Sequence, residues 1–211
     1  MSIFVEALNI FGFHNFVIMP RARQFDEQEV LTKAMELFWK NGYHATSMDD
    51  LVKFAGINRA SLYGIFGGKK ELFYKALDHY RATHANTLSR FLDQQTQVKA
   101  GLRALFYHLV AESLADKDCK GCFFVNTTTE LVPGNDEIQV KLKSNRDAVQ
   151  KTFYNFLLQG AENGQISPDK DLKAIAGLLF TFFNGLRVVT KISDDVQELH
   201  TSIDTILSLL D

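Results

Sequence analysis

The sequence predicts an all-α protein in which a small N-terminal bundle is joined by a long helix to a larger helical domain. Apolar residues recur at steps of three and four along nearly the whole chain, and no run alternates strictly enough to indicate a strand. Only 3 prolines occur in 211 residues, which leaves room for long helices. Hydrophobic residues make up 46% of the chain and charged residues 23%, the balance of a soluble globular protein.

Residues 1–18 differ from the rest. They are rich in Phe and Ile, lack the basic start of a secretory signal, and are too interrupted by polar residues for a membrane span. The stretch that follows, "MPRARQFDEQEV", reads like a natural start at Met19. We therefore expect 1–18 to be an upstream extension. The alternative is an additional helix packed on the body.

Three short helices are predicted after this extension. Asp26, Ser47 and Asn58 each precede an apolar helical pattern, where their side chains can cap the first turn. Asp50 follows Ser47 by three residues, close to a capping box. A glycine then follows each helix and provides its stop. The predicted spans are 26–40, 47–55 and 59–66.

Longer helices are predicted for the remainder of the chain. The first runs from 69 to about 92, and no flexible linker separates it from the short helices. Breaks at "VPGND" (132–136) and "NGQISPD" (163–169) divide the rest. The further helical segments lie at about 97–115, 122–132, 136–163, 169–190 and 193–210.

The second and third helices have the spacing of a helix-turn-helix, with the short turn "AGIN" between them. Leu62 and Phe66 are expected to face the bundle interior, which leaves small and polar residues outside. Arg and Asn can hydrogen-bond base edges, and Ser and Tyr can bond phosphate. The candidate DNA contacts on this helix are Asn58, Arg59, Ala60, Ser61 and Tyr63.

Further candidate DNA contacts are basic or stand at helix N-termini. Ser47, Lys69 and Lys70 lie where backbone N–H groups already favour a phosphate. Arg21 and Arg23 form a basic arm suited to a minor groove or to the backbone. The net charge of the chain is -2, so DNA binding must come from the placement of these groups. A plain helical bundle with solvated charges fits the spacing as well.

Residues 34–73, "AMELFWKNGYHATSMDDLVKFAGINRASLYGIFGGKKELF", resemble the TetR-type transcriptional repressors. The matching positions are "F-x-x-x-G-Y-x-x-T-S", then "A-G-I", then "S-L-Y-x-x-F-x-x-K-x-E-L-F". The resemblance implies that the helix at 59–66 enters the major groove. It also implies phosphate contacts from Thr46, Ser47, Tyr63 and Lys69 or Lys70. Ile65 departs from the family at a position where many members carry a phosphate-binding His or Tyr, and Val52 departs where a small Ala is usual.

The resemblance implies a double-stranded DNA operator, a homodimer and a small-molecule effector as partners, with no membrane. We therefore divide the chain into a helix-turn-helix DNA-binding domain (19–68) and a ligand-binding and dimerisation domain (69–211). Residues 172–190 are apolar nearly all round and, with 193–210, can form a dimer interface. The alternative is that both helices are buried within one subunit.

An effector cavity is expected between the segments at 97–115, 122–132 and 136–163, beside 172–186. The chain has 18 Phe, so an apolar or aromatic effector is the hypothesis. For each residue a purely structural role in the core is the competing interpretation. The candidate lining residues are Phe106, His108, Cys122, Phe123, Asn126, Phe153, Phe156, Phe180 and Phe183.

The stretch "DKDCKGCFFVNTTTEL" (116–131) resembles a "GC-x-x-x-N-x-x-x-E" segment of one TetR branch, in which some regulators sense electrophiles or oxidants through a thiol. Lys117, Lys120 and a helix N-terminus near Cys122 could lower the pKa of its thiol. The alternative is that Cys122 is a small buried hydrophobe. Two cysteines do not form a disulfide framework, which indicates a reducing, cytoplasmic compartment.

An enzyme is the other class considered. The C-x-x-C pair could belong to a dithiol oxidoreductase or a redox-sensing interaction protein, but its surroundings are helical and lack the usual strand-to-helix setting. The sequence has no nucleophile elbow and no strand before its Gly-rich stretch. Its 6 His form no zinc-ligand cluster. We therefore expect no catalysis, no metal and no cofactor.

Overall fold

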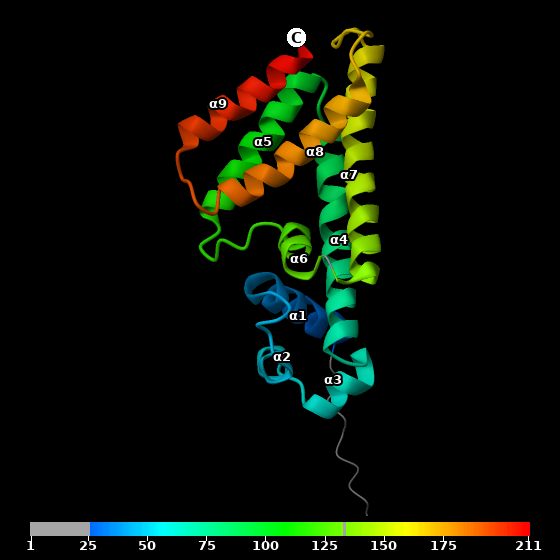
Figure 1. The fold of residues 1–211 in the computed structure, drawn as a ribbon, viewed down its shortest axis with the longest axis vertical. Helices are drawn as coiled ribbons and strands as arrows, with labels where there is room; N and C mark the ends of the chain where they lie inside the picture. Colours follow the sequence, from blue (N-terminus) through cyan, green and yellow to red (C-terminus); the bar gives the residue numbers. More distant parts are fainter. Residues whose placement is uncertain (1–25, 133) are drawn as a thin grey trace, which may run out of the picture.

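The computed structural model describes residues 26–132 and 134–211, and every regular element in that part is a helix. This confirms the predicted all-α class. Figure 1 shows three short helices at one end of an elongated molecule, the long helix α4 running up from beside them, and the other helices above. The helices are α1 (Glu27–Asn41), α2 (Met48–Ala55), α3 (Arg59–Phe66), α4 (Lys69–Asp93), α5 (Val98–Ala115), α6 (Phe123–Leu131), α7 (Asp136–Glu162), α8 (Leu172–Val189) and α9 (Val196–Leu207), followed by the 3₁₀ turn η1 (Ser208–Leu210).

The short helices begin where the sequence supplies a cap. The Asp26 carboxylate accepts a hydrogen bond from the Gln28 N–H at 2.9 Å, and the Asn58 side chain accepts one from the Ser61 N–H at 2.8 Å. These side chains satisfy backbone donors that have no partner within the helix. Gly56 ends α2 in the left-handed conformation, at φ 71°. The starts of α1 and α3 are thus fixed by local chemistry.

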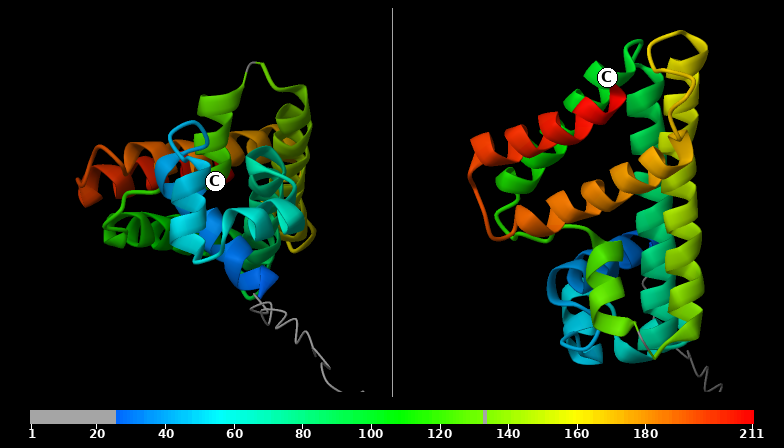
Figure 2. Two further views of the ribbon diagram at one scale, coloured as in Figure 1. Left: turned by 90° about the horizontal axis from the view of Figure 1, so that it is seen from below. Right: turned by 45° about the horizontal axis from the view of Figure 1, so that its top comes forward.

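Two hydrophobic cores occupy the two ends of the molecule. The lower core contains α1, α2 and α3 together with the first half of α4, helix α6 and the start of α7. Phe38 of α1 lies at its centre, edge-on to Phe73 of α4 with 5.0 Å between ring centroids. The upper core is formed by α5, α7, α8, α9 and the end of α4. Both views of Figure 2 show α4 and α7 running side by side.

The lower core extends beyond the predicted DNA-binding segment 19–68. Leu72, Phe73 and Tyr80 of α4 are buried in it, and Phe123 of α6 packs against the Phe73 ring at 5.5 Å. The three short helices therefore share one core with α4 and α6.

Residues 1–18, predicted as an extension, lie outside the described residues.

Candidate nucleic-acid interface

The α2–turn–α3 unit has a buried face and an exposed polar face. Leu51 of α2 and Leu62 of α3 are fully buried in the lower core, and Ile57 of the turn is buried there with them. These anchors hold α3 rigidly at the end of the molecule (Figure 1). A functional face on a rigid helix is positioned more accurately than one on a loop.

The predicted contacts on α3 are mostly exposed. Asn58, Arg59, Ala60 and Tyr63 lie on the solvent side, and the Tyr63 side chain is 45% exposed, while Ser61 is half-buried. An exposed pair joins Arg59 to Asp49 of α2 at 2.7 Å. An exposed ion pair of this kind contributes little stability, so the guanidinium can leave it at small cost.

Lys69 and Lys70 at the start of α4 both have partners. The Lys69 ammonium lies 4.4 Å above the Tyr43 ring, a cation–π contact. Lys70 pairs with Glu137 of α7 at 3.2 Å, and this hydrogen bond raises the pKa of Lys70 above its usual range. Both side chains lie at the start of α4, shortly after the end of α3.

Ser47 and Thr46 are placed differently from each other. Ser47 is exposed and caps α2, where its hydroxyl and the Asp50 carboxylate form the expected capping box. Thr46 is buried, and its hydroxyl donates to the Gly42 carbonyl at 2.7 Å. The Thr46 hydroxyl therefore holds the turn before α2 and is not presented to solvent. Arg21 and Arg23 lie outside the described residues.

Gly64 is a feature of this face that the sequence reasoning missed. It lies inside α3 on the exposed side, and a Cβ built on it meets nothing within 4 Å. Glycine inside a helix costs about 1 kcal/mol relative to alanine, so its position requires a reason. In the sequence, a glycine in the middle of the predicted helix 59–66 is the feature that indicates a special role for this position.

Comparison with known proteins identifies this architecture. Residues 30–76 match the profile described as "Bacterial regulatory proteins, tetR family". Residues 98–206 match the one described as "Tetracyclin repressor-like, C-terminal domain". The two matched ranges cover both the lower bundle and most of the upper one.

The chain belongs to the TetR family. Among curated TetR-type relatives, ComR of Escherichia coli (strain K12), an HTH-type transcriptional repressor, is 32% identical over 192 residues, which cover 90% of each chain. An uncharacterized HTH-type transcriptional regulator of Bacillus subtilis (strain 168), YezE, is 30% identical over 194 residues, which cover 92% of this chain and all of YezE.

A solved TetR-family structure of the same fold carries DNA. A cysteine mutant of the regulator CifR, complexed with a 26-bp double-strand operator, superposes with a TM-score of 0.81 at 27% identity and covers 90% of this chain and 100% of CifR. The reduced form of NemR from E. coli has a TM-score of 0.75 at 17% identity and covers 87% of this chain and 96% of NemR, which shows the shared fold.

The predicted ligand residues of this TetR-family chain do not line one space. Phe106, Phe153 and Phe183 do gather in the upper core, where the Phe106 ring lies 6.4 Å from Phe153 and 6.5 Å from Phe183. Phe156 and Phe180 belong to the same core. These residues come from α5, α7 and α8, as expected for the larger domain.

Other predicted ligand residues lie elsewhere. His108 is exposed, stacked beside the Phe91 ring and 3.2 Å from Glu112, because its position on α5 faces away from the core. Phe123 and Cys122 belong to the lower core. Asn126 links α6 to the end of α8, since its carbonyl oxygen accepts a hydrogen bond from Lys191 at 3.0 Å. The residues predicted to line one cavity thus lie in two separate cores and on the surface.

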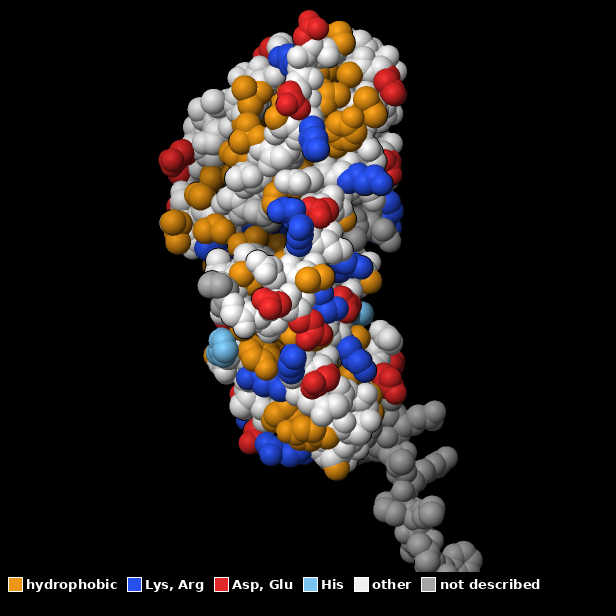
Figure 3. All heavy atoms as spheres, turned by 45° about the vertical axis from the view of Figure 1, so that its right-hand side comes forward, with side chains coloured by type: hydrophobic (Ala, Val, Ile, Leu, Met, Phe, Trp, Pro, Cys, Tyr) orange, Lys and Arg blue, Asp and Glu red, His pale blue; other side chains and the backbone are white. Residues whose placement is uncertain are grey.

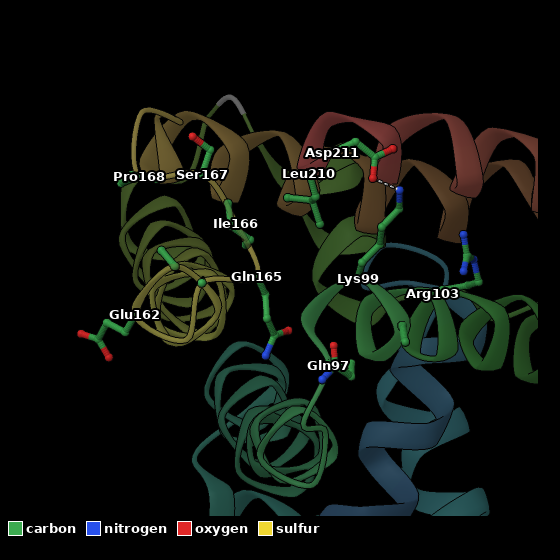
Figure 4. A pocket seen from close by; sticks show the side chains of 13 residues that line it. Gln97, Lys99, Arg103, Glu162, Gln165, Ile166, Ser167, Pro168, Leu210 and Asp211 are labelled. Atoms are coloured by element: carbon green, nitrogen blue, oxygen red, sulfur yellow. Dashed lines mark hydrogen bonds and ion pairs between the residues drawn. The ribbon is translucent and has the colours of Figure 1, made fainter.

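Two surface hollows in the described part of the chain lie apart from these residues. The larger, of about 830 Å³, lies at the end of the molecule farthest from α3, between the start of α5, the end of α7 and η1. Figure 4 shows Lys99 and Arg103 on its α5 wall, with Lys99 paired to Asp211. The smaller lies beside Cys119 and the loop after α8. Neither contains a residue predicted to contact the ligand.

The two cysteines occupy different environments. Cys119 is exposed in the loop before α6, while Cys122 is buried among aromatic residues. Burial raises the pKa of the Tyr80 phenol, and the Cys122 thiol within its hydrogen-bonding reach adds to the rise. The ammonium of Lys120, two residues before Cys122, pairs with Glu36 at 3.0 Å and lies over the Trp39 ring.

No group of three or more His, Cys, Asp or Glu that could hold a metal ion occurs among the described residues. Among the helices of residues 26–132 and 134–211, one, α8, is long and apolar enough to cross a membrane by length and composition, and 17% of it is buried within the chain. A covered core helix passes the same test.

Proposed function

We propose that this chain is a dimeric transcriptional repressor that binds an operator through α3 and is released from it by a small-molecule effector. The observation that carries the proposal is the exposed polar face of α3, held on a buried scaffold at the end of the molecule. The relatives named above are regulators of transcription, and CifR is seen on its operator.

The exposed face supports a division of labour between base and phosphate contacts. Arg59 reads a base edge when it leaves Asp49, and Tyr63 and Ser47 bind phosphates on either side. Lys70 leaves Glu137 for a phosphate, and release of counterions from the DNA favours that exchange. Gly64 allows the backbone of α3 to approach the groove closely. We assign these roles to residues 19–68 with the start of α4.

Dimerisation is supported by uncovered apolar surface on α8, α9, the loop between them and η1. Leu178 is 44% exposed and Ile192 86%, and other hydrophobic residues of these elements are exposed with them. The further members are Val188, Val189, Val196 and Leu209. Figure 3 shows hydrophobic side chains spread over the upper part of the molecule. A second copy that covers this surface places two α3 helices for two half-sites.

We place the effector in the upper domain, residues 69–211. The aromatic rings of Phe106, Phe153 and Phe183 meet there, and α4 joins that core to the lower one. An effector that opens this packed core binds one arrangement of the helices better than the other, which is the condition for shifting the equilibrium. Because the rings around this site are aromatic, the proposed effector is an apolar or aromatic molecule.

The thiol of Cys122 is a second candidate for sensing. The exposed Cys119 is close in sequence, and two free thiols are consistent with a reducing, cytoplasmic location. Against a dithiol enzyme stands the placement of this pair in a loop between helices, with one thiol buried and the other exposed. A sensor role for Cys122 requires α6 to move, because the thiol is covered in this structure.

Selection of bound sites from random double-stranded DNA tests the proposal. The expected result is one enriched motif with two related half-sites about 10 base pairs apart, confirmed by gel shift at physiological salt. A dithiol-reductase assay runs in parallel. No enriched motif, or thiol turnover without DNA binding, contradicts the proposal.

A further inference from the structure

A carboxylate of α6 binds the backbone of the turn between α1 and α2. Glu130 of α6 accepts a hydrogen bond from the Tyr43 N–H at 2.9 Å through Oε2, and one from the His44 N–H at 2.6 Å through Oε1. Both donors lie in the turn between α1 and α2, directly before the helix-turn-helix. Hydrogen bonds to an ionised carboxylate are about twice as strong as neutral ones, and two of them fix direction as well as distance.

The turn is shaped to receive this carboxylate. Gly42 ends α1 at φ 84°, a conformation that favours glycine. A Cβ on Gly42 would stand 2.8 Å from the Glu130 carboxylate oxygen, so the absence of a side chain is what lets the carboxylate approach. The positions of Gly42 and Glu130 are thus complementary although 88 residues separate them in sequence.

The loop before α6 makes further contacts with the same bundle. The Trp39 Nε1–H donates to the Gly121 carbonyl at 3.1 Å, and Lys40 pairs with Asp118 at 2.6 Å. The lysine pair is exposed and contributes little. Among these contacts Glu130 is the one that reaches the turn into α2, so it acts closest to the DNA-reading helices.

The other end of this segment is bound to the proposed dimer helices. Asn126, one turn before Glu130 on α6, accepts a hydrogen bond from Lys191 at 3.0 Å and donates one to the Lys120 carbonyl at 2.8 Å. Lys191 lies two residues after the end of α8. A Cβ on Gly121 would collide with the Lys191 side chain. Helix α6 therefore links the end of α8 to the start of the helix-turn-helix.

We propose that Glu130 is a positioning residue that fixes the orientation of the helix-turn-helix relative to α8 and α9, and so sets the half-site spacing that the dimer accepts. The inference rests on the proposed function, since it needs a dimer on a two-part operator. Glu130 itself touches no DNA in this account. Its carboxylate holds the turn, and the turn holds α2 and α3.

Spacing preference is the property to measure. One inserted base pair turns a half-site by about 35° around the DNA axis and shifts it along that axis. A rigidly oriented dimer loses at least about tenfold in affinity on operators with one base pair added or removed between the half-sites. Gel shifts on these three operators give the discrimination of each protein. The variants are Glu130→Ala, which removes both acceptors, and Glu130→Gln, which is nearly isosteric and keeps one.

The wild type should prefer the parent operator to the two altered ones by at least about tenfold. This affinity ratio should fall at least about fivefold in Glu130→Ala and take an intermediate value in Glu130→Gln. The matched control is Glu162→Ala, which removes an exposed carboxylate at the far end of α7 and should keep wild-type discrimination. Exchange of the His44 amide proton should accelerate in Glu130→Ala. If Glu130→Ala fails to fold, the comparison of Glu130→Gln with the wild type decides.

Different results overturn the positioning role of Glu130 and the repressor function. Equal spacing discrimination in the wild type and both Glu130 variants overturns the positioning role and leaves the repressor assignment intact. A folded wild type that binds no two-part site overturns the repressor assignment, and the positioning role falls with it. A uniform loss of affinity on all three operators, with unchanged discrimination, also overturns the positioning role, because it shows only general destabilisation.

Discussion

Arg59 illustrates how a single side chain can serve two states. In the free protein it pairs with Asp49 at 2.7 Å, and both groups are exposed. The pair keeps the guanidinium over α2 and α3 without binding it tightly. A base edge in the major groove offers Arg two hydrogen bonds in a fixed plane, which the single carboxylate contact does not match.

Arg59→Ala should relax base preference at one position of each half-site by about 1–3 kcal/mol, with weaker effects elsewhere. Tyr63→Ala, by contrast, should weaken binding to all sequences by similar amounts, since it removes a phosphate contact. Binding of both variants to a panel of single-base operator variants measures this. If both bind the panel as the wild type does, α3 is not the reading helix.

The two thiols should react at very different rates. A disulfide reagent should modify Cys119 rapidly in the native protein, since it is exposed, and should modify Cys122 only on unfolding or opening of the lower core. Cys119→Ser should remove the fast phase alone. A fast phase that survives in Cys119→Ser would show that Cys122 is accessible and would favour its role as a sensor.

At the scale of the helix, α2 shows how local sequence sets both position and pH dependence. The Ser47 hydroxyl and backbone N–H lower the pKa of the Asp50 carboxyl. A lowered folded-state pKa means that the cap's contribution is complete above the ordinary value of about 3.9. It is lost as the pH falls through the lowered value. The start of α2 should therefore be unaffected at neutral pH and weaken only in acid.

Ser47→Ala should cost about 1 kcal/mol of unfolding free energy at neutral pH, as loss of an N-cap usually does. Urea unfolding of the DNA-free protein measures this apart from any contact with phosphate. NMR titration of the Asp50 carboxyl should give a pKa below its usual value in the wild type and closer to it in Ser47→Ala. An unchanged Asp50 pKa in the variant would contradict the capping account.

The helix bounds were largely predictable because caps and stops are local. The span 59–66 was predicted and is observed as Arg59–Phe66, between a capping Asn58 and a glycine stop. The segment expected at 193–210 begins later, at Val196, because Asp195 caps it, and its last turn is 3₁₀. Such differences of a few residues reflect competition between neighbouring caps.

Contacts between helices were not predictable in the same way. The bonds from Glu130 to the turn after α1 join residues 86 and 87 positions apart, and no periodic pattern records them. The assignment of Phe123 to the lower core depends on which side of α6 faces α4. His108 faces solvent although its neighbours Phe106 and Leu109 are buried. The sequence shows that a residue is apolar or aromatic, but it does not show which residues it contacts in the fold.

At the scale of the whole molecule, two cores share the helices α4 and α7. The lower core holds the DNA-binding helices and part of α6, and the upper core holds the helices of the proposed dimer surface. The helices α4 and α6 therefore connect the packing of the upper part of the molecule to that of α3. The exposed apolar residues of α8 and α9 lie on the faces of these helices that point away from the upper core.

Leu178→Glu should separate the dimer, because it places a charge within the proposed interface. Sedimentation should give the 23.9 kDa of one chain instead of twice that mass, and operator affinity should fall at least about 100-fold. The matched control is Val140→Glu on α7, a residue that is 69% exposed and lies outside this surface. A Leu178→Glu protein that remains dimeric would place the interface elsewhere.

Hydroxyl-radical footprinting of the protein on its selected operator shows where the two α3 helices of the proposed dimer contact the DNA. Two copies of α3 in successive major grooves should protect two patches of backbone on one face of the DNA, with centres about one helical turn apart. Arg59→Ala should leave this spacing unchanged. A single protected patch, or two patches on opposite faces, would contradict the account.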